Sequence, residues 1–418
     1  MPFSFAHISD VHVGAFRQPA LQKLVLDAFV TAMDVCIERR VDFIVIGGDL
    51  FDSNIPNMAL ANQAVRKMKE VRDRGIPIYV VYGSHDFSPT QTSVVDMLES
   101  AGLFRNVSKG VLVDGKLELE VFRDEKTGAK LCGISGRRLG IEADAFASLD
   151  RGLLERMTGF RIFVFHGSVV ELAPDIMKAG SVPLSDFPRG FSYYAGGHLH
   201  DRTLEQRPDM VVAYPGALFA GGDYQDLEKS AKGMARGFFV VSCGDKVEKV
   251  DFVPVKVCDW QLVECDVSSK TSVQARDLLL ELARETEVSG RVVLFRVSGE
   301  MTAGRTSDID FIEIRRILKE RGAVETLLNY NKLSSKEYAV QSPVSDNPAQ
   351  IEEKLFRERI ATTKFQQKRL VGEQGVTTSK AVLRVLRDAR KDDEVKDDYD
   401  SRLLRGVVNA LDADEVFE

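Results

Sequence analysis

Disulfide frameworks, thiolate metal sites and membrane spans all lack support in this sequence. The chain has only five cysteines, an odd number, widely spaced and without a C-x-x-C pair, so we interpret them as reduced, mostly buried thiols. A run of about 18 apolar residues, which a membrane helix needs, is missing. The first residues lack the basic and then apolar leader of a signal peptide. These features predict a cytoplasmic protein with no membrane contact.

Excess basic charge and a nucleotide-binding loop are missing as well. The net charge is −7, which argues against a surface coated in Lys and Arg for nucleic acid but leaves room for a local basic groove. Residues Gly110 to Lys116 approach a phosphate-binding loop, yet Leu117 stands where the magnesium-binding Ser or Thr belongs, and the stretch predicts a hairpin. We therefore expect this chain to bind no ATP itself.

The length of 418 residues predicts two or three domains. Apolar runs and helical spacing alternate over the first hundred residues, with strands at 3–9, 41–46 and 76–82 and helices at 20–39, 58–74 and 92–100. This alternation favours a layered α/β fold. A hairpin is expected over residues 111–119, with its turn at Asp114-Gly115. Later strands are expected at 161–165, 191–195, 211–214 and 237–241.

The pattern changes after residue 256, so we predict domains at 1–256, 257–335 and 336–418. The middle region alternates strand and helix without a histidine, which predicts a small α/β domain that holds no metal. The last region predicts amphipathic helices near 347–360, 379–390 and 402–411, interrupted by the glycines at 372–375 and a charged linker at 391–400. Such helices either pack on the body or offer apolar faces to another protein.

The histidines mark a candidate site. There are only six, all at or before position 200. His7 lies inside the first strand, where we expect a core histidine. The other five join aspartates and glycines at five strand ends: Asp10-Val11-His12, Gly47-Gly48-Asp49, Gly83-Ser84-His85-Asp86, His166 and Gly196-Gly197-His198-Leu199-His200. Strands that end in Asp or His at five places predict one site assembled from five loops.

Imidazole and carboxylate ligands together suit Mn, Fe or Zn better than Mg or Ca, which prefer oxygen. Six or more ligands are too many for one tetrahedral ion, whereas two ions bridged by one carboxylate use them all. Paired ions about 3.5–4 Å apart hydrolyse phosphate esters, because they activate a water molecule and neutralise phosphoryl charge. The motifs therefore predict a two-metal phosphoesterase.

These residues resemble the calcineurin-like metallophosphoesterase superfamily, whose signature is D-x-H, G-D, G-N-H-D, a lone H and G-H-x-H. A closer resemblance lies in segments 7–14 and 47–52 and in Tyr214-Pro215-Gly216-Ala217. They are similar to the DNA double-strand-break repair nucleases, called SbcD in bacteria and Mre-eleven in archaea and eukaryotes. The resemblance implies a calcineurin-like β-sandwich flanked by helices, then a small α/β capping domain, then a helical C-terminal tail.

Carried over by motif, the resemblance implies roles for individual residues. The site would hold two Mn²⁺ ions, rather than Mg, Fe or Zn. One ion would be held by Asp10, His12, Asp49 and His200, and the other by His166, His198 and Ser84, with Asp49 bridging the two. His85 would act at the scissile phosphate as proton donor or transition-state stabiliser, and Asp86 would orient it. Arg17 and Gln18, just after the first motif, are candidates for a DNA phosphate contact; the alternative is a solvated loop.

The resemblance also implies substrates and partners. It implies 3′-to-5′ exonuclease action on duplex ends, endonuclease action on single strands or hairpins, and a nucleoid-associated location. Helices at 58–71 and 94–103 would form a homodimer. The C-terminal helices, starting at Asn347-Pro348, would dock on the coiled-coil base of an ABC-type, SbcC-like ATPase.

Two positions depart from the family pattern. Ser84 stands where the family has Asn, so it would ligate directly, act through a water, or leave the second metal weaker. Asp52 stands where many archaeal and eukaryotic members have a further histidine, as in the bacterial type. Two other functions remain open: a small-molecule or cyclic-nucleotide phosphodiesterase, and a weakly active scaffold that bridges DNA ends. The capping domain and tail argue against the first, and the intact ligands argue against the second.

Overall fold

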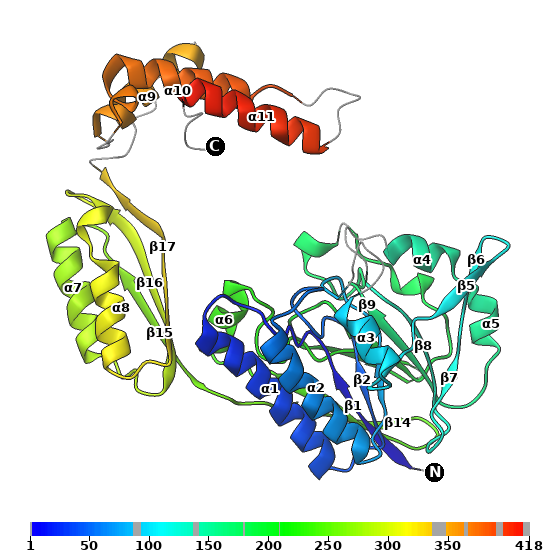
Figure 1. The fold of residues 1–418 in the computed structure, drawn as a ribbon. Coiled ribbons are helices and arrows are strands. Elements are labelled where there is room, and N and C mark those ends of the chain that lie inside the picture. The colour runs from blue at the N-terminus through cyan, green and yellow to red at the C-terminus, as the bar shows by residue number, and fades with distance from the viewer. Residues whose placement is uncertain are drawn as a thin grey trace. The chain divides into compact units, whose positions relative to one another are not determined.

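The chain divides into two units, Met1–Leu333 and Ser334–Glu418. In the first and larger unit, two six-stranded sheets pack face to face (Figure 1). The computed structural model describes residues 2–86, 93–136, 142–178, 180–208, 210–336, 348–362, 367–389 and 396–412. The first sheet has the order β14 (Val247–Pro254), β13 (Gly237–Cys243), β1 (Phe3–Ile8), β2 (Phe43–Ile46), β3 (Ile78–Val80), β4 (Arg105–Asn106). The second has the order β11 (Thr203–Arg207), β12 (Met210–Tyr214), β10 (Tyr193–Gly197), β9 (Arg161–His166), β8 (Lys130–Ile134), β7 (Phe122–Arg123).

The middle strands of each sheet run parallel, which brings their carboxyl ends to one edge. β1, β2 and β3 are parallel neighbours, and so are β8, β9 and β10. The sheets meet through a shared core in which Phe5, Val45 and Tyr79 pack with Ile162 and Tyr193. Because these strands are covered on both faces, their sequences are nearly continuous apolar runs, as β2 shows with four buried residues.

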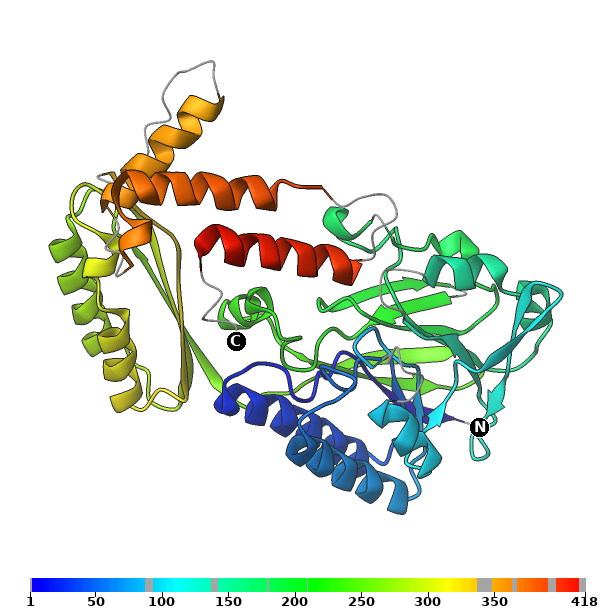
Figure 2. The ribbon, with the colours of Figure 1, turned by 45° about the horizontal axis from the view of Figure 1, so that its top comes forward.

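Helices cover the outer face of each sheet (Figures 1 and 2). α1 (Pro19–Glu38), α2 (Met58–Asp73) and α3 (Val94–Ser100) share a core with the first sheet. α4 (Glu142–Ser148) and α5 (Arg151–Glu155) share one with the second. These elements confirm the predicted calcineurin-like sandwich flanked by helices.

Local signals in the sequence set several boundaries. Asn57 caps α2 by accepting hydrogen bonds from the amides of Ala59 and Leu60. The hairpin β5 (Gly110–Val113) and β6 (Lys116–Leu119) turns through Asp114 and Gly115 at φ of 48° and 77°, the pair of positive φ angles that a type I′ turn needs. The stretch that approaches a phosphate-binding loop forms this hairpin.

A smaller sheet follows in the same unit, with β15 (Asp259–Asp266), β16 (Arg291–Met301) and β17 (Glu325–Ser335). α7 (Ser272–Glu285) and α8 (Phe311–Glu320) cover one face of it (Figure 1). Its other side reaches the core of the first sheet, where Trp260 stacks on Phe219 at 5.5 Å between ring centroids. Helix α6 (Tyr224–Ala231) lies at this junction, and Glu228 of α6 accepts a hydrogen bond from Arg296 of β16 at 2.9 Å.

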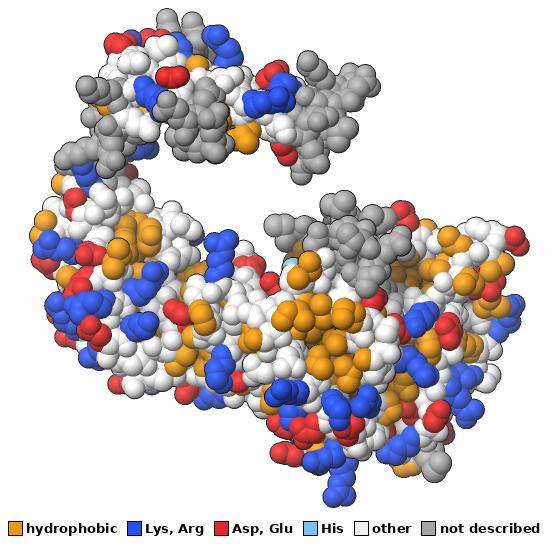
Figure 3. Space-filling view, in the orientation of Figure 1, with side chains coloured by type: hydrophobic (Ala, Val, Ile, Leu, Met, Phe, Trp, Pro, Cys, Tyr) orange, Lys and Arg blue, Asp and Glu red, His pale blue; other side chains and the backbone are white. Residues whose placement is uncertain are grey.

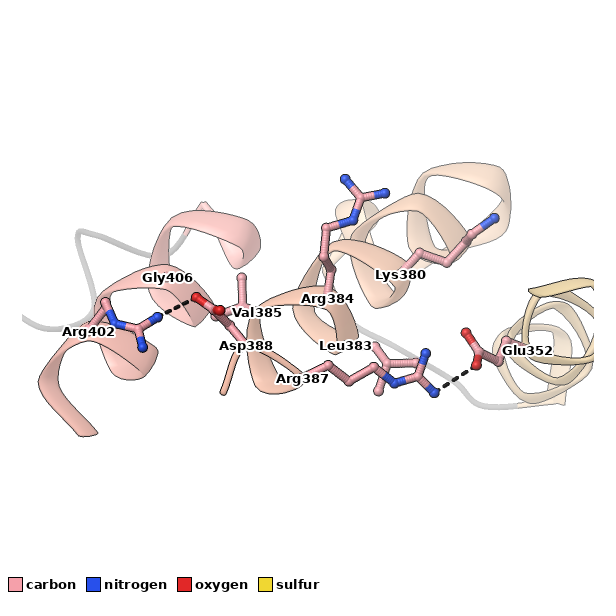
Figure 4. A pocket seen from close by; sticks show the side chains of 9 residues that line it. All are labelled: Glu352, Lys380, Leu383, Arg384, Val385, Arg387, Asp388, Arg402 and Gly406. Carbon is pink, nitrogen blue, oxygen red and sulfur yellow. Dashed lines mark hydrogen bonds and ion pairs between the residues drawn. The ribbon is translucent and has the colours of Figure 1, made fainter. Parts of the chain in front are cut away.

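The tail contains α9 (Pro348–Thr362), α10 (Gly372–Leu386) and α11 (Lys396–Leu411). Ion pairs join these helices around a surface pocket, Arg387 with Glu352 at 2.7 Å and Arg402 with Asp388 (Figure 4). Two boundaries differ from prediction. α10 begins at Gly372 instead of residue 379, and α11 begins at Lys396 inside the expected linker. Glycine and charged residues were interpreted as breaks, but both are compatible with the exposed first turn of a helix. Asn347, the predicted cap, lies outside the described residues.

Two further expectations concern cysteine and the membrane. All five cysteines are free; Cys258 is half-buried and the other four are buried. Among the described residues, no helix combines the length and apolar character that crossing a membrane requires. His7 is a core histidine as expected: its buried Nδ1 pairs with the Tyr193 hydroxyl at 3.0 Å, and burial lowers its pKa to about 3.

Candidate metal centre

Five loops converge where β1, β2 and β3 of the first sheet and β9 and β10 of the second reach their carboxyl ends. The backbone amide of His198 donates to Asp10 Oδ1 at 3.0 Å, which joins the first motif to the last. The amide of His85 donates to Asp49 Oδ1 at 2.9 Å, and His166 Nε2 lies 3.3 Å from Asp49 Oδ2. The structure thus places all five predicted motifs together.

Unusual backbone angles mark the predicted ligands. Asp10, His12, Asp49 and His198 have φ of 50°, 52°, 51° and 94°, in the left-handed region that side chains other than glycine rarely adopt. Such strain collects at functional sites, where the surrounding fold holds it in place. Among the described residues, nine other than glycine have positive φ, and four of these nine are predicted metal ligands.

Two glycines of the motifs make room for the ligands. A Cβ on Gly48, which has φ of +99°, would lie 2.4 Å from His166 Nδ1. A Cβ on Gly83 would lie 2.0 Å from Asp49 Oδ1. Both positions therefore need glycine for the close approach of the ligand side chains.

Some imidazole nitrogens of the centre are buried without a hydrogen-bond partner in the described part of the chain, which fits a bound cation. Asp10, His12, Asp49 and His166 are at most 2% exposed. Nε2 of His12 and of His166 have no hydrogen-bond partner within the described part of the chain. Burying such atoms, and two carboxylates beside them, is costly unless something compensates them. Among the described residues, three groups have candidate ligand atoms within 4.8 Å of one another: Asp10-His12-His200, His12-Asp52-His85 and Asp10-Asp49-His166.

Two of the candidate ligand imidazoles, those of His166 and His200, use Nδ1 for a hydrogen bond to a protein partner and turn Nε2 to the centre. His166 Nδ1 donates to the Gly47 carbonyl at 2.8 Å. His200 Nδ1 donates to the Asp226 carboxylate at 2.6 Å, while its Nε2 lies 4.0 Å from Asp10 Oδ1. Holding one ring nitrogen in this way fixes the tautomer and leaves the other lone pair for a metal.

His12 and His85 share Asp52. The Asp52 carboxylate lies 3.4 Å from His12 Nδ1, and the Asp52 carbonyl accepts from His85 Nδ1 at 2.8 Å. The His85 side chain is 44% exposed, whereas that of His12 is 1% exposed. His85 therefore lies on the solvent side of the centre, where a substrate can reach it.

Asp86 acts on the loop backbone. Its carboxylate accepts hydrogen bonds from the amides of Gly83, Leu50 and Phe51 at 3.0–3.2 Å, and the partner of the His85 ring is Asp52. Any orienting effect of Asp86 on His85 is thus transmitted through the main chain. The contacts of Asp86 hold the motif loops together, and its expected role in orienting His85 stays a prediction.

Burial and charge set the protonation of the metal-free centre. Burial alone would raise the pKa of Asp49, but the histidines beside it, His166 foremost, lower it well below the usual range. Burial would lower the pKa of His166, and the Asp49 charge instead raises it to about 10. Burial and the charge of His166 lower the pKa of His198 to about 4. A metal ion would replace the proton that compensates Asp49.

The remaining predicted residues lie around this cluster. The His198 ring is 5.3 Å from that of His166, and half-buried Ser84 follows Gly83 in the same loop. Arg17 is exposed and Gln18 precedes α1 as its N-cap. Asp226 and its partner Arg236 were missed, because neither belongs to a motif at a strand end; the glycine pair at 221–222 was the available signal of a close approach.

The comparisons with known proteins agree with this geometry. Residues 3–211 match the family of calcineurin-like phosphoesterases, and the chain belongs to that family. It is therefore a metal-dependent phosphoesterase, a hydrolase.

Curated relatives confirm the closer resemblance to proteins of DNA double-strand-break repair. The chain is 28% identical over 349 residues to "DNA double-strand break repair protein Mre11" of Archaeoglobus fulgidus, covering 77% of this chain and 76% of the relative. It is 25% identical over 329 residues to the protein of that name from Sulfolobus acidocaldarius, covering 75% and 81%. A third, from Sulfurisphaera tokodaii, is 31% identical over 238 residues, covering 54% and 57%.

Proposed function

We propose that this chain is the nuclease subunit of a DNA double-strand-break repair complex, acting at the nucleoid. Its reaction is hydrolysis of DNA phosphodiester bonds, as a 3′-to-5′ exonuclease on duplex ends and an endonuclease on single strands. The observation that carries the proposal is the buried set of carboxylates and partnerless imidazole nitrogens in a chain whose relatives bear the name of a DNA-repair protein.

Seven side chains hold two Mn²⁺ ions in this proposal. Asp10, His12, Asp49 and His200 form one position, and Asp49, His166, His198 and Ser84 form the other. The bound ions supply an activated water and neutralise charge on the phosphoryl oxygens. The chain contributes the fixed orientation of its ligands, because three of the four histidines have a hydrogen-bonded or nearby Nδ1 partner.

His85 is the proposed catalytic residue. Its Nδ1 is held by the Asp52 carbonyl at 2.8 Å, which leaves Nε2 of this 44% exposed side chain for the scissile phosphate. In the charged state of the ring, Nε2–H can give its proton to the leaving 3′-oxygen. Asp86 supports this placement by holding the loop backbone on both sides of the motif.

The test is Mn²⁺-dependent cleavage of end-labelled linear duplex DNA by the purified chain, beside a His85→Ala control. Cleavage by the wild type and none by the control is the expected result. Because His85 holds no metal in this proposal, the control should still bind two Mn²⁺ ions per chain. No cleavage by either protein, with one ion or none bound, would favour the DNA-end scaffold instead.

The α2–α3 surface supports a homodimer. Ile55, Met58 and Met97 are 78%, 63% and 62% exposed, and hydrophobic side chains gather over these helices in Figure 3. Single exposed apolar residues are ordinary, but a cluster on neighbouring helices is typical of an interaction surface. We propose that a second copy of the chain covers it.

The tail supports an ATPase partner. Apolar side chains of its helices line a groove, among them Phe356, Val382 and Leu386. Leu386 and Leu404 are more than half exposed. We propose that the coiled-coil base of an ABC-type ATPase binds here, and that truncation after Ser335 abolishes co-purification with that partner without loss of Mn²⁺ binding.

Arg17 is proposed to contact a DNA phosphate, with Gln18 beside it. It is exposed at the end of the loop that carries Asp10 and His12. Replacing Arg17 with Ala is expected to weaken DNA binding and to lower the slope of log affinity against log salt by about one phosphate contact. Unchanged affinity and slope would assign Arg17 to a solvated loop.

A further inference from the structure

His200 differs from the other ligand histidines in how it is held. The side chains of His12 and His166 are 1% exposed and fixed by packing, whereas that of His200 is 26% exposed. It belongs to the loop after β10, at the solvent rim of the centre. A metal ligand in this position needs specific contacts to fix its side chain, because a partly exposed imidazole can rotate to another rotamer.

Asp226 of α6 provides such contacts. Its buried carboxylate accepts the His200 Nδ1 proton at 2.6 Å and the amide of Gly221 at 3.0 Å. The other oxygen accepts from Arg236 Nη2 at 3.2 Å. Because these bonds come from three separate places in the chain, His200, Gly221 and Arg236, the carboxylate cannot turn without breaking several of them.

Arg236 fixes both ends of this contact. Its Nη1 donates to the backbone carbonyl of His200 at 2.5 Å, and its Nη2 also donates to the backbone carbonyl of Asp226 at 3.1 Å. Its Nε donates to the Ser230 hydroxyl at 3.1 Å, one turn further along α6. One buried guanidinium therefore ties the main chain of the ligand to the helix that carries its carboxylate partner.

Gly221 closes the remaining side of the ring. A Cβ built there would lie 1.9 Å from His200 Cε1 and 2.6 Å from Nε2. The imidazole thus packs directly on the Gly221 backbone, which leaves it a single position between the glycine and the carboxylate.

From these contacts we infer that Asp226, Arg236 and Gly221 form a positioning unit that aims His200 Nε2 at the first metal. The inference rests on the proposed metal centre and adds residues that no motif contains. Asp226 touches neither metal nor substrate, and it acts only through His200. Carboxylate partners of metal-bound histidines fix the ring and raise its basicity, and their loss typically weakens metal binding about 10- to 100-fold.

The experiment is a titration of the metal-free full chain with Mn²⁺, in which free Mn²⁺ is followed by electron paramagnetic resonance without DNA. His200→Ala identifies the binding step that uses this ligand. Asp226→Asn is expected to weaken the same step about 10- to 100-fold and to leave the other step unchanged. The double variant is expected to bind no more weakly than His200→Ala alone, because Asp226 has no other route to the metal.

A matched control separates positioning from general loosening of α6. Glu228→Gln makes the same carboxylate-to-amide change two residues away and removes the ion pair to Arg296, but Glu228 does not touch His200. It is expected to bind Mn²⁺ like the wild type. Equal weakening by Glu228→Gln, or additive effects of Asp226→Asn and His200→Ala, would overturn the inference.

Gly221→Ala serves if loss of the Asp226 charge prevents folding by leaving Arg236 unpaired. This variant keeps the buried ion pair whole and displaces only the ring, so it must weaken the same binding step. Unchanged Mn²⁺ affinity would overturn the inference. A wild type that binds no Mn²⁺ would overturn the metal centre as well, whereas binding without DNA cleavage would overturn only the nuclease proposal.

Discussion

Gly83→Ala tests whether the metal centre is built on close backbone approach. The added Cβ would lie 2.0 Å from Asp49 Oδ1 and 2.3 Å from the Asp49 amide nitrogen, far inside van der Waals contact. The φ angle of Gly83 is not positive, so the conflict is one of space rather than of backbone strain. Because Asp49 is 2% exposed and its Oδ1 accepts from the His85 amide at 2.9 Å, it cannot simply move aside.

The magnitude follows from two costs. Overpacking a filled site costs about 1–3 kcal/mol. Breaking a hydrogen bond to a charged acceptor costs about 1.5–3 kcal/mol. A total of roughly 2.5–6 kcal/mol corresponds, at about 2–4 °C per kcal/mol, to a fall in melting temperature of roughly 5–24 °C. In the proposed centre Asp49 is shared by both ions, so both Mn²⁺ binding steps should weaken together.

Gly152→Ala is the matched control, because it adds the same methyl group in helix α5. There φ is not positive, and the nearest atom to the new Cβ, Asp150 Oδ1, is 3.4 Å away. Alanine is favoured over glycine in a helix by about 1 kcal/mol, so this variant should melt at or above the wild-type temperature. The reasoning is refuted if Gly83→Ala melts like Gly152→Ala and still binds two Mn²⁺ ions.

Three other changes give independent tests. Ser84→Asn lengthens the arm that carries the neutral oxygen, so the second Mn²⁺ step should tighten about tenfold in a metal titration; no change would mean that residue 84 does not ligate directly. Met58→Glu places a charge on the exposed α2–α3 surface and should convert the proposed dimer to a monomer, because a charge buried in the interface would be unpaired. Light scattering measures this change, and the melting temperature should not fall. A persisting dimer would place the interface elsewhere. Burial lowers the pKa of His7 from 6.5 to about 3 in the folded chain. Between these two pH values the unfolded chain therefore binds one more proton than the folded chain, so the free energy of unfolding falls as the pH drops. His7→Phe should therefore remove about 1.4 kcal/mol per pH unit from the acid slope of urea unfolding, and equal slopes would contradict the assignment.

The sequence was sufficient to predict that the candidate ligands lie together, because of where parallel strands end. Asp10, Asp49 and His166 each follow an apolar run, and parallel neighbours place such residues at one edge of their sheet. The sequence does not show how the two sheets pack, yet five loops with Asp or His could be assigned to one site without that knowledge. Chemistry that sits at the ends of regular elements is predictable in this way.

The role of Asp226 could not be predicted from the sequence, because Asp226 does not lie at the end of a strand. It lies in the first turn of α6, 26 positions after the histidine that it holds, and no spacing rule joins a strand-end ligand to a later helix. Its role comes from tertiary packing, through Arg236 and the bare backbone of Gly221. The start of α10 at Gly372 was missed in a related way, since glycine is disfavoured within a helix but tolerated in its first turn.

The proposed ligand sets are unequal, and this inequality makes the role of residue 84 matter. The first position has two carboxylates, and both of its imidazoles, His12 and His200, lie beside a further carboxylate at Nδ1. The second shares one carboxylate, and its His166 is held by a neutral carbonyl. Negative charge favours a divalent cation, so the first ion is held by charge and the second mostly by neutral donors. In this proposal Ser84 gives the second position a weak neutral oxygen donor where an amide would be stronger, so we expect occupancy of the second position to limit hydrolysis.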